Sequence, residues 1–290
     1  MIDNKLKRKA IPYFLLLPAT VLIGLFKIYP ILYSVVGSFF KTGRGGVVSF
    51  AGFNNYINLF HEKGFANSVF VTLKYCILVT LIQVVLAIAL ALFLNRNALA
   101  VRVCRTLIYV PVAVNMVIAC TIWNMFFSAS TGLANTILRT LGLAEQPWLT
   151  SKEQALYVLM FIACWKGISY WMMFLLAGLQ NIGDSVHEAA LLDGASYFEE
   201  LFQITLPLMK NSLLFVIVSD TLINMFMFTP VYLMTKGGPS MSTDTLMFEA
   251  YRSAFGYSNY PRAYALVTVM LLIAVSIAGI QFFIMNRGDR

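Results

Sequence analysis

Apolar residues in this chain gather in long continuous runs, without the alternation of a half-buried strand. Six runs are long enough to cross a bilayer, which takes roughly 20 apolar residues of helix. The runs cover residues 11–38, 70–94, 104–127, 156–179, 211–235 and 264–286. Only helices and closed barrels satisfy their backbone groups in lipid, and continuous runs favour helices. The pattern therefore predicts an all-α membrane protein with six transmembrane helices.

Composition supports this class. Of the 290 residues, 59% are hydrophobic and only 12% are charged, which is too apolar for a soluble domain of this size. We expect residues 1–290 to form a single transmembrane domain. The first run follows a basic start, lacks a clear cleavage site and is too long for a signal peptide, so it is expected to be retained. Short surface helices are expected in the loops near residues 53–60 and 133–141, where apolar residues recur at helical spacing.

The net charge of +8 could indicate nucleic-acid binding, but its distribution indicates a membrane topology instead. If the six spans alternate, the densest basic segments fall on one side. These residues are Lys5, Lys7, Arg8, Lys9, Arg96, Arg102, Arg105, Arg287 and Arg290. Basic residues in short loops mark the cytoplasmic face. We therefore expect a multi-pass protein of the bacterial cytoplasmic membrane, with both termini and residues 180–210 in the cytoplasm, lipid as a partner and no nucleic acid.

A short polar segment separates the fourth and fifth runs, and its residues 188–207 read EAALLDGASYFEELFQITLP. Ser185 with Glu188 and Ser196 with Glu199 both match a capping box, in which Ser is the N-cap and Glu the third helical residue. Gly194 lies between the two helix starts, where a C-terminus favours a residue that tolerates positive φ. The segment predicts two short helices joined at Gly194 and ended near Pro207, too small for a domain and suited to docking.

The spacing of this segment resembles the EAA loop of membrane subunits of binding-protein-dependent ABC importers. The matching positions are Glu188, Ala189, Ala190, Asp193, Gly194, Ile204, Leu206 and Pro207. In that family the loop seats in a groove of a cytoplasmic ATPase subunit, so the resemblance implies that these residues dock an ATPase. A purely local role stays open, in which Glu188 caps its own helix and the two alanines are helix formers.

The resemblance continues along nearly the whole chain. Tyr29-Pro30, residues 53–56, residues 132–135 and residues 177–180 are similar to carbohydrate importers of the maltose type. The Gly237-Gly238-Pro239 stretch resembles the first of the two permeases of such systems. The resemblance implies a type I importer permease core with a cytoplasmic coupling loop over residues 181–208. It also implies three kinds of protein partner: a second homologous permease, a dimer of ATPase subunits and an extracytoplasmic solute-binding protein.

Catalytic and metal-binding motifs are missing from the sequence. No G-x-x-x-x-G-K-[ST] loop occurs, so we expect a non-catalytic permease, with ATP and Mg²⁺ bound by a partner chain. The two histidines, His61 and His187, are far apart, and the four cysteines form no C-x-x-C pair. No metal site and no cofactor are expected in this chain, and His187 is expected to be a solvated residue beside the docking glutamate.

Two ionisable residues fall near the middle of predicted spans, Lys166 in the fourth and Asp220 in the fifth. Such residues are costly in a membrane and serve as functional hypotheses by default. We expect the two to pair, either as a strut between helices or as part of a translocation path. The path candidates are Trp165, Lys166, Tyr170, Asp220 and Asn224. Aromatic faces with hydrogen-bonding groups suit sugar rings, although Trp and Tyr also belong to membrane-interface belts.

The predicted function is therefore import of a sugar or oligosaccharide, coupled to ATP hydrolysis by a separate subunit. An importer of glycerol-3-phosphate or glycerophosphodiesters is the alternative, because residues 165–170 also resemble permeases of that type and Lys166 could meet a phosphate. An ATP-independent secondary transporter is a more distant alternative. A membrane enzyme would need a clustered catalytic set, which the sequence does not show.

Overall fold

The computed structural model describes residues 14–43, 47–96 and 98–286. The terminal basic residues on which part of the topology prediction depends, and the start of the first predicted span, lie outside these ranges. The chain divides into two compact units, one of Met1–Glu62 with Ala250–Leu271 and one of Lys63–Glu249 with Leu272–Arg290. Helix α14 (Tyr260–Asn286) contributes its first part to one unit and its second part to the other.

The first unit contains an apolar helical stretch over Phe14–Gly37, which includes η1 (Gly24–Ile28) and α2 (Tyr29–Gly37). A small antiparallel hairpin follows, with β1 (Phe40–Thr42) paired to β2 (Val48–Phe50), and then comes α3 (Asn54–His61), which confirms the predicted surface helix. The Asn55 amide ties these parts together, because its Nδ2 donates to the carbonyls of Ser38 and Phe40, each at 2.7 Å.

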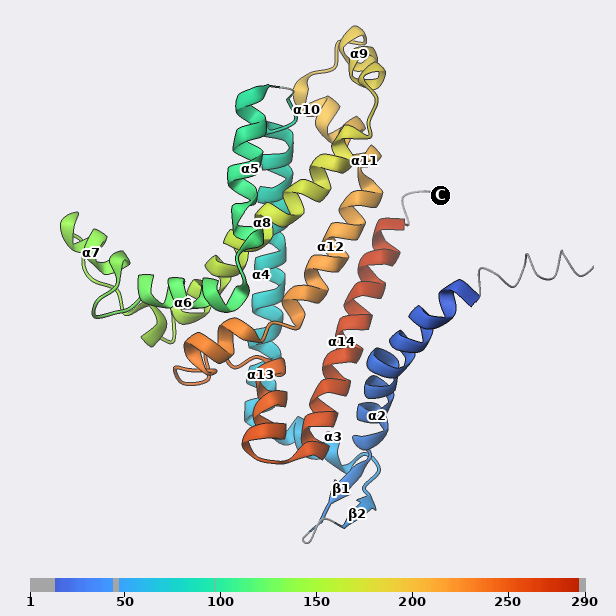
Figure 1. Ribbon diagram of the computed structural model, residues 1–290, viewed down its shortest axis with the longest axis vertical. Helices are drawn as coiled ribbons and strands as arrows, with labels where there is room; N and C mark the ends of the chain where they lie inside the picture. Colours follow the sequence, from blue (N-terminus) through green and yellow to red (C-terminus); the bar gives the residue numbers. More distant parts are fainter. Residues whose placement is uncertain (1–13, 44–46, 97, 287–290) are drawn as a thin grey trace, which may run out of the picture. The chain divides into compact units, whose positions relative to one another are not determined.

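The second unit holds the long helices that frame the candidate sites (Figure 1). Its helices along the chain are α4 (Lys63–Phe93), α5 (Leu99–Ala113), α6 (Met116–Phe126), α7 (Leu133–Thr140), α8 (Ala155–Gln180), α9 (Asp184–Leu192), α10 (Tyr197–Glu199), η4 (Glu200–Thr205), α11 (Leu206–Leu208), α12 (Lys210–Met225) and η5 (Val231–Thr235). The one-turn η3 (Trp148–Thr150) precedes α8, while α13 (Leu246–Tyr251) and η6 (Arg252–Gly256) precede α14. Helix α7 confirms the second predicted surface helix.

Four described helical stretches are long and apolar enough to cross a membrane, and the number rises to six if each of two bent pairs counts as one span. The expectation of a continuous third helix over residues 104–127 was wrong, because α5 and α6 meet at a 95° bend. Pro111 weakens the end of α5, and the Asn115 side chain caps the start of α6 by accepting from the Val117 amide at 2.9 Å.

The expected fifth helix over residues 211–235 is also interrupted. Helix α12 ends at Met225. Helical structure resumes at Thr229, with two α-helical residues followed by the π-helix η5. Proline, here Pro230, donates no backbone hydrogen bond, and its ring crowds the carbonyl four residues earlier, that of Phe226, so a regular helix cannot run through this stretch. At its other end, α12 meets the preceding helical segment Tyr197–Leu208 at an angle of 71°.

The core of the second unit lies where α4, α8 and α12 pack together. Small and large side chains alternate there, with Ala87 and Met172 fully buried and Leu175 beside them. Gly178 is required for this packing, because a Cβ at that position would lie 2.5 Å from the Ser212 hydroxyl on α12. The outward positions carry large exposed hydrophobic side chains, such as Phe70 and Ile77 on α4, which is the pattern of helices surrounded by lipid.

Candidate functional site

The segment from Asp184 to Leu208 forms a hairpin, here called the docking hairpin, at one end of the long helices of the second unit (Figure 1). Its first arm is α9, and its second arm runs from α10 through η4 to α11. Gly194 connects the arms with a φ of +77°, and the Ala195 amide donates to the Ala190 carbonyl at 3.0 Å to close the turn. The predicted role of Gly194 is therefore confirmed, because L-residues adopt this backbone conformation only at a cost.

The second arm starts with the predicted capping box. The Ser196 hydroxyl accepts from the Glu199 amide, and the Glu199 carboxylate accepts from the Ser196 amide at 2.8 Å. Hydrogen bonds from the Ser196 hydroxyl and then from its backbone amide hold the pKa of Glu199 below its usual range. The second predicted box, Ser185 with Glu188, was wrong. The N-cap of α9 is Gly183 without a side-chain cap, because α9 begins two residues earlier than that box requires.

His187 and Glu200 connect the two arms of the docking hairpin. His187 Nδ1 lies 2.5 Å from Glu200 Oε1, and their side chains are only 29% and 22% exposed. The expectation of a solvated His187 was therefore wrong. The acceptor lies thirteen positions further along the chain, and only the turn at Gly194 brings it beside the histidine.

The docking hairpin presents large apolar side chains to its surroundings. The exposed ones are Leu191, Leu192, Tyr197, Phe198 and Phe202, and Leu192 is 89% exposed. Glu188, Ala189, Asp193, Gly194 and Pro207 of the resemblance motif are exposed, whereas Ile204 and Leu206 are half-buried. Ala190 is only 4% exposed, so its small side chain packs within the hairpin itself, and its predicted contact with a partner stays a prediction. An exposed apolar cluster on a polar segment marks an interaction surface.

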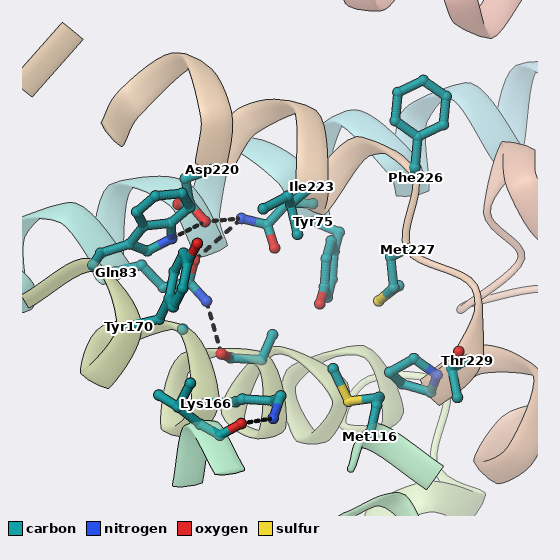
Figure 2. A pocket seen from close by; sticks show the side chains of 16 residues that line it. Tyr75, Gln83, Met116, Lys166, Tyr170, Asp220, Ile223, Phe226, Met227 and Thr229 are labelled. Atoms are coloured by element: carbon teal, nitrogen blue, oxygen red, sulfur yellow. Dashed lines mark hydrogen bonds between the residues drawn. The ribbon is translucent and has the colours of Figure 1, made fainter. Parts of the chain in front are cut away.

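A second candidate site is a cavity of about 480 Å³ between α5–α6, α8 and α12, here called the polar cavity (Figure 2). Four of the predicted path residues line it, namely Lys166, Tyr170, Asp220 and Asn224. Trp165 is not among the lining residues of this cavity, so its predicted place in the path stays a prediction. Its ring instead packs edge-on against Trp123, with centroids 5.4 Å apart, in an aromatic cluster beside α6.

Lys166 and Asp220 do not pair, contrary to expectation. The Lys166 ammonium donates to the carbonyl oxygens of Pro111, Val112 and Val114 at 3.1, 3.0 and 2.5 Å. Asp220 is 1% exposed, and its Oδ1 accepts from Trp171 Nε1 at 2.6 Å and from Asn224 Nδ2 at 3.0 Å. The partner of Lys166 that the sequence analysis did not foresee is the C-terminal end of α5. This helix end is within reach because α5 stops in the middle of a predicted span.

Gln83 is a cavity residue that the sequence analysis missed. Its Nε2 donates to the Ala163 carbonyl at 2.7 Å, and its Oε1 accepts from Asn224 Nδ2 at 3.2 Å. Gly167 on α8 makes room for it, because a Cβ at that position would collide with the Gln83 amide. The available signal was a buried amide inside an otherwise apolar run, which deserves the same attention as an ionisable residue in a membrane.

The fold and the two candidate sites, a polar cavity between apolar helices and an exposed hairpin at one end, are typical of a membrane-spanning subunit of the transport permease class. The chain belongs to the family of binding-protein-dependent transport system inner membrane components, which matches residues 83–287. It is therefore an ABC importer permease and an inner membrane component.

Several characterised relatives cover nearly the whole chain. The probable ABC transporter permease protein YurN of Bacillus subtilis is 32% identical, with 97% of this chain and 98% of the relative covered. The trehalose/maltose transport system permease protein MalF of Thermococcus litoralis is 30% identical, with 94% and 93% covered. The sn-glycerol-3-phosphate transport system permease protein UgpA of Agrobacterium fabrum is also 30% identical, with 94% of each covered.

The fold has solved counterparts. A bacterial ABC transporter involved in the import of the acidic polysaccharide alginate contains a chain with a TM-score of 0.86 and 23% identity, covering 100% of this chain and 99% of its own. A second structure of the alginate transporter, in complex with an alginate pentasaccharide-bound periplasmic protein, matches with a TM-score of 0.85, 23% identity and 99% and 98% covered. At this identity the likeness establishes the type I importer permease fold.

Proposed function

We propose that this permease imports a sugar or oligosaccharide and that ATP hydrolysis by a separate subunit drives the transport. One observation carries the coupling part of the proposal: the docking hairpin exposes Leu191, Leu192, Tyr197, Phe198 and Phe202 next to the exposed Glu188. A cytoplasmic ATPase dimer would cover this surface, one copy for this chain and one for a second, homologous permease. ATP and Mg²⁺ would bind to the ATPase, and both termini of this chain would lie in the cytoplasm.

The docking hairpin is built to transmit force. Its two arms are joined by a turn at Gly194 and by the contact between His187 and Glu200, and the Ser196–Glu199 capping box fixes the start of the second arm. Its second arm continues through a 71° bend into α12, which carries Asp220 and Asn224 of the polar cavity. Closure of the ATPase dimer would therefore move a cavity wall. Coupling requires that nucleotide and solute each bind the two conformations with different affinity.

The sugar assignment rests on the polar cavity together with the relatives. Aromatic rings of Tyr75, Tyr170 and Trp171 line the cavity beside the amides of Gln83 and Asn224, a lining that suits the apolar faces and hydroxyl groups of a sugar. The alginate transporter crystallised with a periplasmic protein supports an extracytoplasmic solute-binding protein as the source of the solute. Glycerol-3-phosphate remains the second candidate, because UgpA is about as similar to this chain as MalF.

Crosslinking tests the coupling proposal. A single cysteine at the exposed Ala189 is expected to crosslink to the ATPase subunit in the assembled transporter, whereas one at the buried Ala190 is the matched control and is expected to react poorly. Failure of every hairpin position to reach an ATPase would contradict the proposal. A secondary transporter is tested in the same preparation, because it would purify without any ATPase and take up solute without ATP.

A further inference from the structure

The hydrogen-bond donors of the polar cavity are almost all used within the protein. The Lys166 ammonium has three N–H donors, and the carbonyls of Pro111, Val112 and Val114 accept all three. These carbonyls belong to the last turn of α5 and to the break after it, where the regular hydrogen bonds of the helix end and, within the described part of the chain, only the Pro111 oxygen also accepts from a backbone amide, that of Val114. The positive charge also lies at a helix C-terminus, where the helix dipole favours a cation.

Lys166 therefore acts on one side of the 95° corner between α5 and α6, while Asn115 acts on the other by capping α6. Val112 and Met116, which flank the corner, both line the cavity (Figure 2 shows Lys166 and Met116). The side chain that holds this wall comes from α8, so the shape of the cavity depends on one contact between helices.

The remaining donors follow the same pattern. Trp171 Nε1 donates to Asp220, Gln83 Nε2 donates to the Ala163 carbonyl, and Asn224 Nδ2 is shared among Thr80, Gln83 and Asp220. The unused groups are acceptors. Among the residues that the structure describes, none donates to Asn224 Oδ1 or to Asp220 Oδ2. The other polar groups of the lining are hydroxyls, those of Tyr75, Tyr170 and Thr229, which can donate or accept.

Such a lining favours a ligand that donates hydrogen bonds and carries no negative charge. The ionised phosphate or carboxylate group of a solute offers only hydrogen-bond acceptors. That group would also have to lose its hydration water near the Asp220 carboxylate. To gain a donor from Lys166 it would have to remove a bond from the end of α5 and leave a backbone carbonyl unpaired. A neutral polyol donates from each hydroxyl and needs neither change.

We propose that Lys166 is a positioning residue that holds the α5–α6 corner, and that the polar cavity consequently takes an uncharged, hydroxyl-rich solute and discriminates against solutes that carry an ionised phosphate or carboxylate group. This inference rests on the proposed function and refines it. It assigns Lys166 a structural role at the end of α5 and excludes it as a ligand of a substrate phosphate.

Transport specificity tests the solute class. Proteoliposomes with the complete transporter and its binding protein are supplied with maltotriose, a trimer of galacturonate or glycerol-3-phosphate. Uptake of the neutral trimer is expected to exceed uptake of either anion at least tenfold. Lys166→Met is expected to lower residual uptake of all three by a similar factor, and Lys166→Arg to restore most of it. A selective loss of anion uptake in Lys166→Met, or faster uptake of an anion by the unaltered protein, would overturn the inference.

Hydrogen exchange of the assembled transporter tests the corner without reference to any solute. Lys166→Met is expected to speed exchange of the amides of residues 112–117 at least tenfold, and Lys166→Arg much less. Lys74→Met is the matched control, since Lys74 is another lysine of a predicted span and lies over the Tyr157 ring, 5.0 Å from its centroid. Unchanged exchange in Lys166→Met overturns the positioning role. Absence of ATP-dependent uptake of any solute, with the corner behaving as expected, overturns the proposed function instead.

Discussion

At the scale of single residues, the polar groups of the membrane-spanning region are distinguished by what they contact. Asp220 and Lys166 looked alike in the sequence, since both are charged residues in apolar runs. In the structure Asp220 belongs to a network of side chains from three helices, whereas Lys166 serves backbone carbonyls. The two residues therefore predict different consequences when their charges are removed.

Asp220→Asn is expected to preserve assembly and to lower uptake at least tenfold. Trp171 Nε1 and Asn224 Nδ2 both donate to Oδ1 of Asp220, whereas Oδ2 has no hydrogen-bond partner among the described residues. An asparagine can therefore keep the accepting oxygen and place its amide nitrogen at the position of Oδ2. The substitution thus changes charge with little change of shape. Assembly is measured by co-purification, and uptake is measured separately from ATPase activity. Lost assembly would indicate a strut, and normal uptake would show that the charge has no role in the path.

Gly194→Val is expected to weaken the docking hairpin, because a β-branched residue at φ +77° costs about 1–2 kcal/mol. The expected result is at least a severalfold loss of co-purified ATPase at limiting concentration. Gly183→Ala is the matched control, since Gly183 directly precedes the docking hairpin and has an ordinary φ of −67°. Equal behaviour of the two variants would show that backbone strain at the turn has no bearing on docking.

At the scale of elements, the docking hairpin combines local and distant contacts. The capping box forms between Ser196 and Glu199, which are only three residues apart, so it needs only the first turn of the second arm to be helical. The contact between His187 and Glu200 spans thirteen positions and exists only once both arms are placed. Local contacts thus start the arms, and distant contacts set the angle between them.

Glu200→Gln is expected to loosen the two arms without unfolding either. An uncharged amide in place of the carboxylate weakens the interaction with His187, and charge-assisted hydrogen bonds are roughly twice as strong as neutral ones. Amides of residues 184–192 should exchange severalfold faster, and solute-stimulated ATPase activity should fall relative to basal activity. Lys152→Met, which removes an exposed ion pair with Glu153 elsewhere on the chain, is the control and should change neither.

The capping box has a predicted pH dependence. A carboxyl group with a depressed pKa stabilises the fold at pH values above its unfolded pKa, and this contribution is lost as the pH falls through the folded pKa. For Glu199 the loss should therefore occur below its ordinary value of 4.5, so exchange of the amides at 197–200 should be steady from pH 7 to pH 5 and rise under stronger acid, after correction for the intrinsic rate. In Ser196→Ala the protection should already be reduced at pH 7. A loss of protection near pH 6 in the unaltered protein would contradict this assignment.

At the scale of the whole molecule, helix α8 determines which segments lie on opposite sides of the membrane. Its 26 residues are about 39 Å long, enough to cross the hydrocarbon core once. The segment 128–154 before it and the docking hairpin after it must then face opposite sides of the membrane. In the second unit α9 lies at one end of the long helices, whereas α7 lies to their side, away from α9 (Figure 1).

Topology labelling tests this orientation. In intact cells, a membrane-impermeant maleimide is expected to modify a cysteine at the exposed Leu143 and to leave one at Ser196 unmodified until the membrane is opened. The charge distribution and the proposed ATPase contact both place Ser196 in the cytoplasm. The reverse labelling pattern would contradict the orientation and the coupling proposal together.

The sequence by itself determined the class of fold, the approximate spans, the capping box at Ser196, the turn at Gly194 and the family. These features depend on residues close together along the chain: runs of apolar side chains, a cap three residues from its partner and a motif of fixed spacing. Four of the five proposed path residues also line one cavity, because intramembrane polar groups are rarely placed without a use.

Only the tertiary structure decided which partner each polar group takes. Lys166 binds the end of α5 because that helix stops in the membrane-spanning region, and Trp165 turns to an aromatic cluster while Gln83 enters the cavity beside Gly167. His187 meets Glu200 because the hairpin folds back on itself. A buried polar group must form its hydrogen bonds with whichever groups the packing of the helices brings within reach. The periodicity of the sequence carries no information about which groups those are.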